Sequence, residues 1–263
     1  MMNTTQMTRI TIEIRNHLML IGLNRAAKRN AFDSLMIDEL SQTLTTYEDQ
    51  TDLRCAVIYA HGEHFTAGLD LVELQPRMSD GIFSEDMNLI NPWGTTGRKR
   101  KKPVVVAVKG YCFTAGIELM LNADICIAHQ NTQFTQLEVQ RGILPFGGAT
   151  SRFVKTAGWS NAMRYLLTGD FFDAATAYRL HLITEVTEQD PLDRAIELAK
   201  SIASAAPLAV QATLTAAHEA ISHDEQYAFN QLKTHLLPLI QSEDAVEGMR
   251  AMSEKRQPRF KGQ

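Results

Sequence analysis

The sequence has few cysteines and no long apolar run, and both shortages narrow what the protein can be. Only three cysteines occur among 263 residues, Cys55, Cys112 and Cys126, and no two stand at C-x-x-C spacing. Each lies in or beside an apolar segment, so we expect buried, reduced thiols in a cytoplasmic protein. No apolar run approaches 18 residues, and the N-terminus lacks the basic-then-apolar order of a signal peptide, so neither membrane insertion nor secretion is expected.

The sequence also lacks an excess of positive charge. There are 26 Lys and Arg residues against 30 Asp and Glu, a net charge of −4, so no nucleic-acid partner is expected. One basic run, Arg98–Lys102, departs from this balance. It could be a solvated helix end, a contact to the phosphates of a ligand or a nucleic-acid contact, and the absence of interleaved aromatic residues weighs against the last.

No metal-binding pattern stands out. His61 and His64 flank Glu63, but the spacing offers no third ligand and is not the helical H-E-x-x-H arrangement. We therefore predict no metal site.

Short apolar runs predict an α/β fold. Residues 10–14 and 18–23 have the pattern of a β-hairpin, and Asp33 or Ser34 should cap a helix of roughly 16 residues. The runs 55–60, 104–108 and 125–128 do not alternate with polar residues, which predicts strands covered on both faces, as in a parallel sheet.

The remaining segments are predicted to be mainly helical. Residues 78–102 are predicted to form a polar helix between two of the strands. A strand–turn–helix unit would then repeat, and right-handed crossovers would wind the repeats into a spiral. Further helices are expected at 148–157, 160–167, 173–180 and 191–204, with a strand at 183–186 among them. From Pro207 onward the helices have more apolar surface than one layer can bury, so docking on the core or on another subunit is expected.

The four-residue sequence Phe-Thr-Ala-Gly occurs twice, at 65–68 and at 113–116, and each copy follows a short apolar run by a few residues. The first helical residues after such a turn leave N–H groups without partners, and Gly68 and Gly116 allow the backbone to bend sharply. Two such turns on neighbouring parallel strands would aim N–H donors at one crevice. Donors that meet on one oxygen form an oxyanion hole, worth about 2.7–4 kcal/mol per donor.

Two glutamates are the candidate acid and base of this crevice. Glu118 lies just inside the helix that follows the second copy of Phe-Thr-Ala-Gly, and Glu138 comes twenty residues later, after another strand. A strand–loop–strand passage of this length can return the chain to the same pocket. Paired carboxyl groups there can hold a water molecule and divide the acid and base roles.

With these motifs the chain resembles the enoyl-CoA hydratase/isomerase (crotonase) superfamily. The segments FTAGLDL at 65–71, KPVVVAVKGYCFTAGIELMLNADICIA at 102–128 and FTQLEVQRGILPFGGATSRF at 134–153 carry the resemblance, which extends from about residue 10 to 262. It implies an α/β, crotonase-like spiral of repeated ββα units with a C-terminal helical region. Residues 1–200 would form the spiral core with the acyl-CoA site, and 201–263 the oligomerisation region of a homotrimer or dimer of trimers.

The resemblance also assigns roles. The backbone N–H groups of Leu69 and Ala115 would form the oxyanion hole; Glu118 would activate water, and Glu138 would protonate the α-carbon. Coenzyme A would be part of the substrate, with no separate cofactor. Its phosphates and remaining parts would be contacted by Arg25, Lys28, Ala67, Gly68, Asp70 and Leu71.

The resemblance leaves several activities open. An enoyl-CoA hydratase is favoured, because the isomerases of the family generally lack the acid at the position of Glu118. A Δ3,Δ2-enoyl-CoA isomerase, an acyl-CoA hydrolase and a non-catalytic CoA- or RNA-binding member are the alternatives. The chain departs from the family where three glycines are usual, since it has Thr114-Ala115-Gly116, and it has Leu137 in place of the usual proline before Glu138.

Overall fold

The computed structural model describes residues 7–77, 81–84 and 86–263. A six-stranded sheet runs in the order β1-β2-β3-β4-β6-β9. Its strands are β1 (Ile10–Arg15), β2 (Leu18–Leu23), β3 (Cys55–Ala60), β4 (Val104–Val108), β6 (Ile125–His129) and β9 (Glu185–Thr187). The first two pair antiparallel as the predicted hairpin, and every later strand is parallel to its neighbour. The predicted parallel sheet is confirmed.

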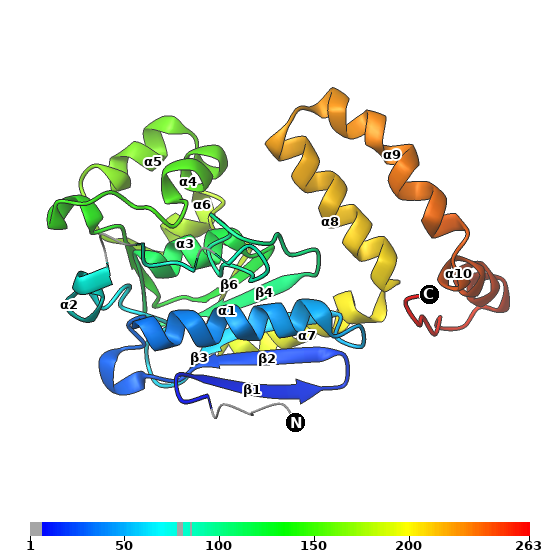
Figure 1. The fold of residues 1–263 in the computed structure, drawn as a ribbon, viewed down its shortest axis with the longest axis horizontal. Coiled ribbons are helices and arrows are strands. Elements are labelled where there is room, and N and C mark those ends of the chain that lie inside the picture. The colour runs from blue at the N-terminus through cyan, green and yellow to red at the C-terminus, as the bar shows by residue number, and fades with distance from the viewer. Residues whose placement is uncertain (1–6, 78–80, 85) are drawn as a thin grey trace.

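Helices cover both faces of this sheet, which explains why its strands are apolar throughout (Figure 1). On one face Met19, Ile21, Ile58 and Val106 pack with α1 (Ser34–Asp49). On the other face alternate residues of the same strands pack with α7 (Pro191–Ser204). The Asp33 carboxylate accepts a hydrogen bond from the Met36 N–H, which confirms the predicted cap of α1.

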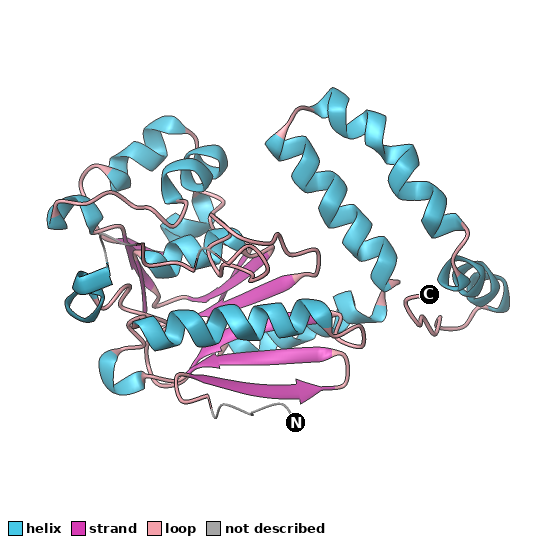
Figure 2. Cartoon of the chain, viewed as in Figure 1, coloured by secondary structure: helices cyan, strands magenta, loops and turns pink. Residues whose placement is uncertain are grey.

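A second, three-stranded sheet was not predicted. It consists of β5 (Tyr111–Phe113), β7 (Gln133–Thr135) and β8 (Phe172–Asp173). Around it lie α2 (Leu71–Leu74), α3 (Ala115–Asn122), α4 (Ala149–Ala157), α5 (Trp159–Leu166) and α6 (Ala174–Arg179). Strands of two or three residues are too short to give a sequence pattern of their own. Figure 2 shows this part of the chain beside the larger sheet.

The C-terminal helices form an arm that extends from the core (Figures 1 and 2). It contains α8 (Pro207–Ser222), α9 (Glu225–Ile240) and α10 (Glu243–Glu254). Within α8 only Pro207 is buried, and within α9 only Ala228. The tail after α10 returns to the core, where the Arg54 guanidinium donates to the Phe260 carbonyl at 2.7 Å. In the part of the chain described, none of the helices is both long and apolar enough to span a membrane.

The helix predicted at 78–102 is wrong for the described part of that segment, residues 81–84 and 86–102, which forms turns and irregular backbone. Pro92 cannot donate a hydrogen bond, and Gly94 and Gly97 have φ values of +62° and +71°. These residues break a helix at short intervals. Residues 78–80 and 85 lie outside the described part.

The basic run at the end of this segment is used inside the protein. The Arg100 guanidinium pairs with Asp124 at 2.7 Å. The Lys102 side chain is buried, and its ammonium donates to the carbonyls of Tyr47 at 3.0 Å and Gln50 at 2.6 Å. Since these carbonyls lie at the C-terminal end of α1, Lys102 satisfies acceptors that the helix leaves open. These contacts favour a structural role over a ligand contact.

We expect Lys102→Met to destabilise the fold by about 2 kcal/mol, because it leaves two carbonyls without their buried donor. For a chain of this size that corresponds to a loss of roughly 4–8 °C in the unfolding temperature, measured by calorimetry. Lys101→Met is the matched control, since the Lys101 side chain is exposed. Equal unfolding temperatures for the two variants would contradict this role.

Candidate active site

Two backbone segments that are far apart in the sequence lie side by side at the edge of the core. The Thr66 N–H donates to the Tyr111 carbonyl at 2.9 Å, and the Phe113 N–H donates to the Thr66 carbonyl at 3.2 Å. Thr66 and Cys112 are thus partners in a short parallel ladder. Thr66 and Cys112 are 46 residues apart, whereas the two Phe-Thr-Ala-Gly sequences are 48 residues apart. Matching positions of the two sequences are therefore not partners in space. The spatial register instead brings the neighbourhoods of Leu69 and Ala115 together.

The pairing between the two segments ends just before Leu69 and Ala115. The Gly68 N–H turns to the Thr66 hydroxyl at 3.1 Å, and the Gly68 carbonyl accepts from Phe32 at 2.8 Å on the opposite side. Within the described chain, neither the Leu69 N–H nor the Ala115 N–H has an acceptor. Ala115 is the first residue of α3, where a helix leaves its N–H free. Two amides are therefore available to an oxygen atom of a ligand.

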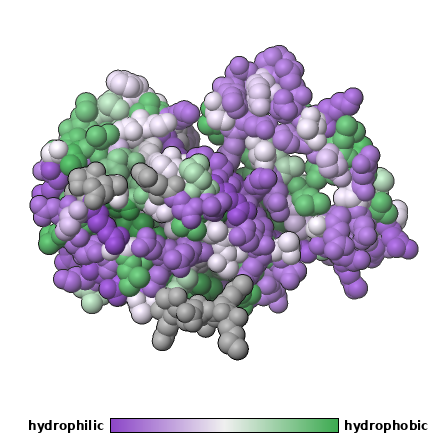
Figure 3. All heavy atoms as spheres, viewed as in Figure 1, coloured by the Kyte–Doolittle hydropathy of each residue, from purple (hydrophilic) through white to green (hydrophobic). Residues whose placement is uncertain are grey.

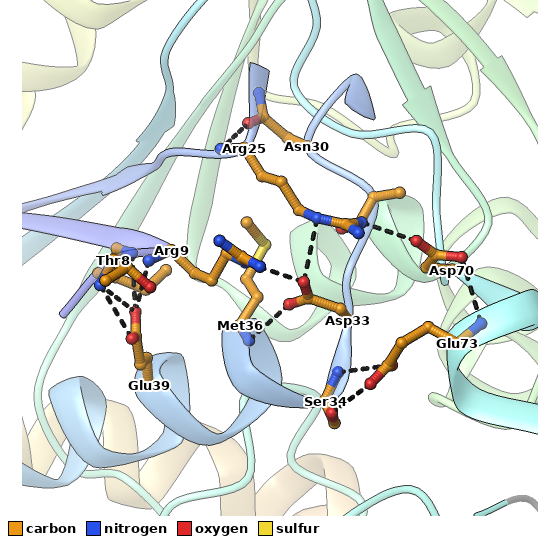
Figure 4. Close-up of polar contacts among 12 residues, drawn as sticks. Thr8, Arg9, Arg25, Asn30, Asp33, Ser34, Met36, Glu39, Asp70 and Glu73 are labelled. Carbon is orange, nitrogen blue, oxygen red and sulfur yellow. Dashed lines mark hydrogen bonds and ion pairs between the residues drawn. The ribbon is translucent and has the colours of Figure 1, made fainter. Parts of the chain in front are cut away.

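A group of ion pairs holds the segment that contains Leu69 and Asp70 in place (Figure 4). The Arg25 guanidinium contacts Asp33 at 3.0 Å and Asp70 at 2.8 Å. Asp70 follows Leu69 directly, and Glu73 accepts from the Ser34 N–H at 3.0 Å. With both carboxylates engaged, Arg25 joins the start of α1 to the segment that contains Leu69 and Asp70. The phosphate contact that the resemblance suggested for Arg25 stays a prediction, and the geometry favours a positioning role.

The other residues expected to contact coenzyme A lie beside this strand. Lys28 is exposed at the end of a short 3-10 helix, Ala26–Lys28, and has no ion-pair partner among the described residues. The Ala67 N–H donates to the Arg29 carbonyl at 2.9 Å, which places the loop with Lys28 next to 67–71. Ala67 and Leu71 are partly exposed, whereas Gly68 is buried.

Glu118 is buried in a ring of backbone donors. It lies in the first turn of α3, is 3% exposed and accepts from the Ala149 N–H at 3.0 Å. The N–H groups of Gly147 and Gly148 also act on it, at the N-terminus of α4. Burial raises the pKa of this carboxyl above its ordinary value, while these donors and Arg152 oppose the rise. The side chain is fixed in position yet remains able to take up a proton.

Glu138 belongs to the same site. It begins the 3-10 helix Glu138–Arg141 and is 6% exposed. Burial and the nearby charge of Glu118 raise the pKa of Glu138 to about 8. In the orientation that satisfies its hydrogen bonds, the buried Gln136 side chain donates to both Glu138 oxygens at 2.9 Å. The two glutamates are thus electrostatically coupled, and burial favours the protonated form of Glu138.

Aromatic residues lie next to the two candidate catalytic elements, and two of them, Trp93 and Phe83, belong to the segment between the motifs that covers the acyl pocket in the family. The indole N–H of the buried Trp93 donates to the Ala115 carbonyl at 2.8 Å. Phe83 lies against Trp93, with ring centroids 4.8 Å apart, and also against Phe146 at 5.8 Å. These aromatic rings form an apolar wall beside Glu118. Only the Gly147-Gly148 pair before a helical segment could have indicated in advance an N-terminus that binds a carboxylate.

Comparison with known proteins identifies the family. The sequence model of the enoyl-CoA hydratase/isomerase family matches residues 13–263. The chain belongs to the enoyl-CoA hydratase/isomerase family. It has the crotonase-like fold predicted for it, an α/β core with C-terminal helices.

Individual members of the family are similar over nearly the whole chain. The mevalonyl-coenzyme A hydratase sidH of Aspergillus fumigatus is 34% identical over 93% of this chain and 92% of its own. The enoyl-CoA hydratase EchA19 of Mycobacterium tuberculosis is 32% identical over 95% of each chain. The crystal structure of a probable enoyl-CoA hydratase/isomerase from Mycobacterium abscessus is 46% identical, with a TM-score of 0.94 over 98% of this chain and all of that one.

The described residues contain no group of three or more His, Cys, Asp or Glu side chains that could hold a metal ion. His61 instead bonds to the Thr11 hydroxyl at 2.7 Å, and His64 stacks on Tyr111 with ring centroids 4.1 Å apart. All three cysteines are free and buried, as predicted.

Proposed function

We propose that this protein is an enoyl-CoA hydratase, which adds water across the 2,3 double bond of a 2-enoyl-CoA thioester. The observation that carries the proposal is the pair of buried, coupled carboxyl groups beside two backbone amides without acceptors. The Leu69 and Ala115 N–H groups would bind the thioester oxygen. As water adds to the β-carbon, the thioester becomes an enolate, and two fixed donors stabilise its charge without rearranging.

The two glutamates then take different roles. Glu118, held by the N–H groups of α4, would accept a proton from the attacking water molecule. Glu138, whose pKa is the one raised to about 8, would deliver its proton to the α-carbon. In the reverse reaction the two roles exchange, so one pair serves both directions. The chemistry balances with water and the thioester alone, and no separate cofactor is required.

The substrate would lie with its acyl group against Trp93, Phe83 and Phe146 and its coenzyme A portion along 67–71. Lys28 is available for a phosphate, because it is exposed and has no ion-pair partner within the described chain. Arg25 would contribute by fixing the segment that contains Leu69.

We expect a bell-shaped pH dependence of hydration. The rate should fall above about pH 8, because Glu138 then loses the proton that it must donate. It should also fall at acidic pH, because Glu118 becomes protonated at a pH above the ordinary range for glutamate. Initial rates with crotonyl-CoA between pH 5 and 10 would test this. A rate that keeps rising well beyond pH 8 would count against the assignment of Glu138 as the acid.

The deciding test of the activity is turnover. Purified protein mixed with crotonyl-CoA should remove the absorbance of the conjugated thioester, and the 3-hydroxyacyl-CoA product should be found by mass spectrometry. Conversion of a 3-enoyl-CoA without addition of water would indicate an isomerase instead. Release of free thiol would indicate a hydrolase, and binding without any reaction would indicate a non-catalytic member.

We also propose that the chain works as a homotrimer or a dimer of trimers. Large apolar side chains are exposed on α9, namely Tyr227, Phe229, Leu232, Leu236, Leu237 and Ile240. Others are exposed on and near α4 and α5, namely Leu144, Trp159, Leu167 and Phe171. Figure 3 shows green atoms on the arm and on the part of the core that carries α4 and α5. Light scattering should give three or six times the 29.4 kDa of one chain, and a monomer would contradict the proposal.

A further inference from the structure

Thr114 has a backbone conformation that its side chain disfavours. Its φ of 49° and ψ of −114° lie outside the regions open to residues with a β-carbon, and a β-branched residue fits there least well. Glycine adopts such a conformation without a steric cost. The surroundings fix the strained geometry, since the Thr114 N–H donates to Thr135 at 2.9 Å and its carbonyl accepts from Ile117 at 2.9 Å. Strain of this kind collects at functional sites.

The Thr114 side chain lies against Gly68, the residue before Leu69. A β-carbon built on Gly68 would meet the Thr114 hydroxyl oxygen at 1.9 Å, so this oxygen rests directly on the glycine. Gly68 immediately precedes Leu69, just as Thr114 immediately precedes Ala115. The hydroxyl is only partly buried and has no hydrogen-bond partner among the described residues. A hydroxyl without a partner among the described residues therefore lies against Gly68, the residue before one unpaired amide, and is carried by the residue before the other.

We infer that the Thr114 hydroxyl is a third donor to the thioester oxygen, and the inference rests on the proposed use of Leu69 and Ala115. A hydroxyl can rotate its hydrogen toward an oxygen that gains negative charge, so the bond strengthens as the enolate forms. The strained backbone is what presents the side chain at this point. A glycine would remove both the strain and the donor.

Thr114→Val and Thr114→Ser separate the hydroxyl from the shape of the side chain. Valine keeps the volume and the branching but has no donor, and it should lower kcat for crotonyl-CoA hydration by about tenfold or more. Serine keeps the donor and should retain most of the rate. Equal losses in the two variants would show a purely structural role and overturn the inference, as would a Thr114→Val enzyme with the wild-type rate.

A binding measurement keeps this result apart from the proposed activity. Acetoacetyl-CoA carries a β-ketothioester whose enolate resembles the charge that the site would stabilise, and its binding does not require hydration. Calorimetric titration should show at least about tenfold weaker binding to Thr114→Val than to Thr114→Ser. If the two variants differed in Kd in this way but the wild-type protein did not hydrate crotonyl-CoA, the hydratase proposal would be rejected and the Thr114 inference would stand. Equal Kd values for the two variants, or no binding to the wild-type protein, would overturn the inference.

Thr114→Gly tests the strain itself. Its unfolding temperature should rise by about 2–4 °C above that of Thr114→Val, because strain relief exceeds the entropy that glycine adds to the unfolded chain. Its kcat should match that of Thr114→Val, since both lack the donor. A Thr114→Gly enzyme as fast as the wild-type protein would contradict the inference.

Discussion

Replacing either Glu118 or Glu138 by glutamine should lower the rate of crotonyl-CoA hydration about a hundredfold or more. Glutamine keeps the shape of each side chain but cannot exchange a proton, and positioned acid or base groups contribute about 10²–10⁴ in rate. Both carboxyl groups are almost fully buried, so bulk water cannot easily take over their roles. Initial rates with purified variants give the measurement. Glu63→Gln is the matched control, because Glu63 is exposed and outside the site.

The two variants should differ in a second measurement. Exchange of the α-hydrogens of a saturated acyl-CoA in D₂O needs the proton carrier at the α-carbon but no attacking water molecule. We expect Glu138→Gln to abolish this exchange and Glu118→Gln to retain part of it, as followed by NMR. The reverse result would exchange the roles of the two glutamates. Wild-type hydration rates in either variant would remove that residue from the mechanism.

The framework of the fold could be predicted because local chemistry specifies it. A strand that is apolar on both sides is buried only when other elements cover both faces of its sheet. The structure places β3, β4 and β6 in such a sheet. Asp33 caps α1 because its carboxylate meets a free N–H three residues later. These signals depend on neighbouring residues, so one sequence suffices to find them.

The errors arise where distant contacts override local pattern. The segment before Pro103 is charged like a surface helix, but Pro92, Gly94 and Gly97 interrupt it, and Lys102 and Arg100 bind distant acceptors at the end of α1 and at Asp124. The short strands β5, β7 and β8 exist only because they pair with one another. The donors to Glu118 come from α4, 31 residues further along the chain at Ala149. No spacing rule within one segment predicts such contacts.

The site shows the same division. The identity of Glu118 and Glu138 follows from the motifs that carry the family resemblance, whereas the rise in their pKa values depends on burial and, for Glu138, on the nearby charge of Glu118. The repeated Phe-Thr-Ala-Gly sequence points to the two turns, and the family motifs assign Leu69 and Ala115, which are not equivalent positions within the repeat. Pairing of Thr66 with Cys112 makes Leu69 and Ala115 correspond in space, two residues away from the alignment of the two copies.

Gly147→Ala should reduce hydration about as strongly as loss of a catalytic group, although residue 147 has no side chain that could react. A β-carbon at this position would lie 2.5 Å from the Glu118 Oε2 atom and 2.9 Å from the Trp93 ring. Both neighbours are buried, and the Trp93 indole is itself bonded to Ala115, so Glu118 is the group that must move. A displacement of about 1 Å at a reacting group can cost about a hundredfold in rate. We therefore expect kcat to fall by that factor.

Overpacking should also destabilise the fold by about 1–3 kcal/mol, so kcat and the unfolding temperature must be measured on the same preparation. Gly248→Ala is the matched control. A β-carbon there would meet Phe260 at an ordinary 3.6 Å, far from the site in α10, and alanine favours the helix. If Gly147→Ala folded normally and kept the kcat of the Gly248→Ala control, Glu118 could not be held as closely as the structure indicates. Its proposed role as the base that orients water would then fail.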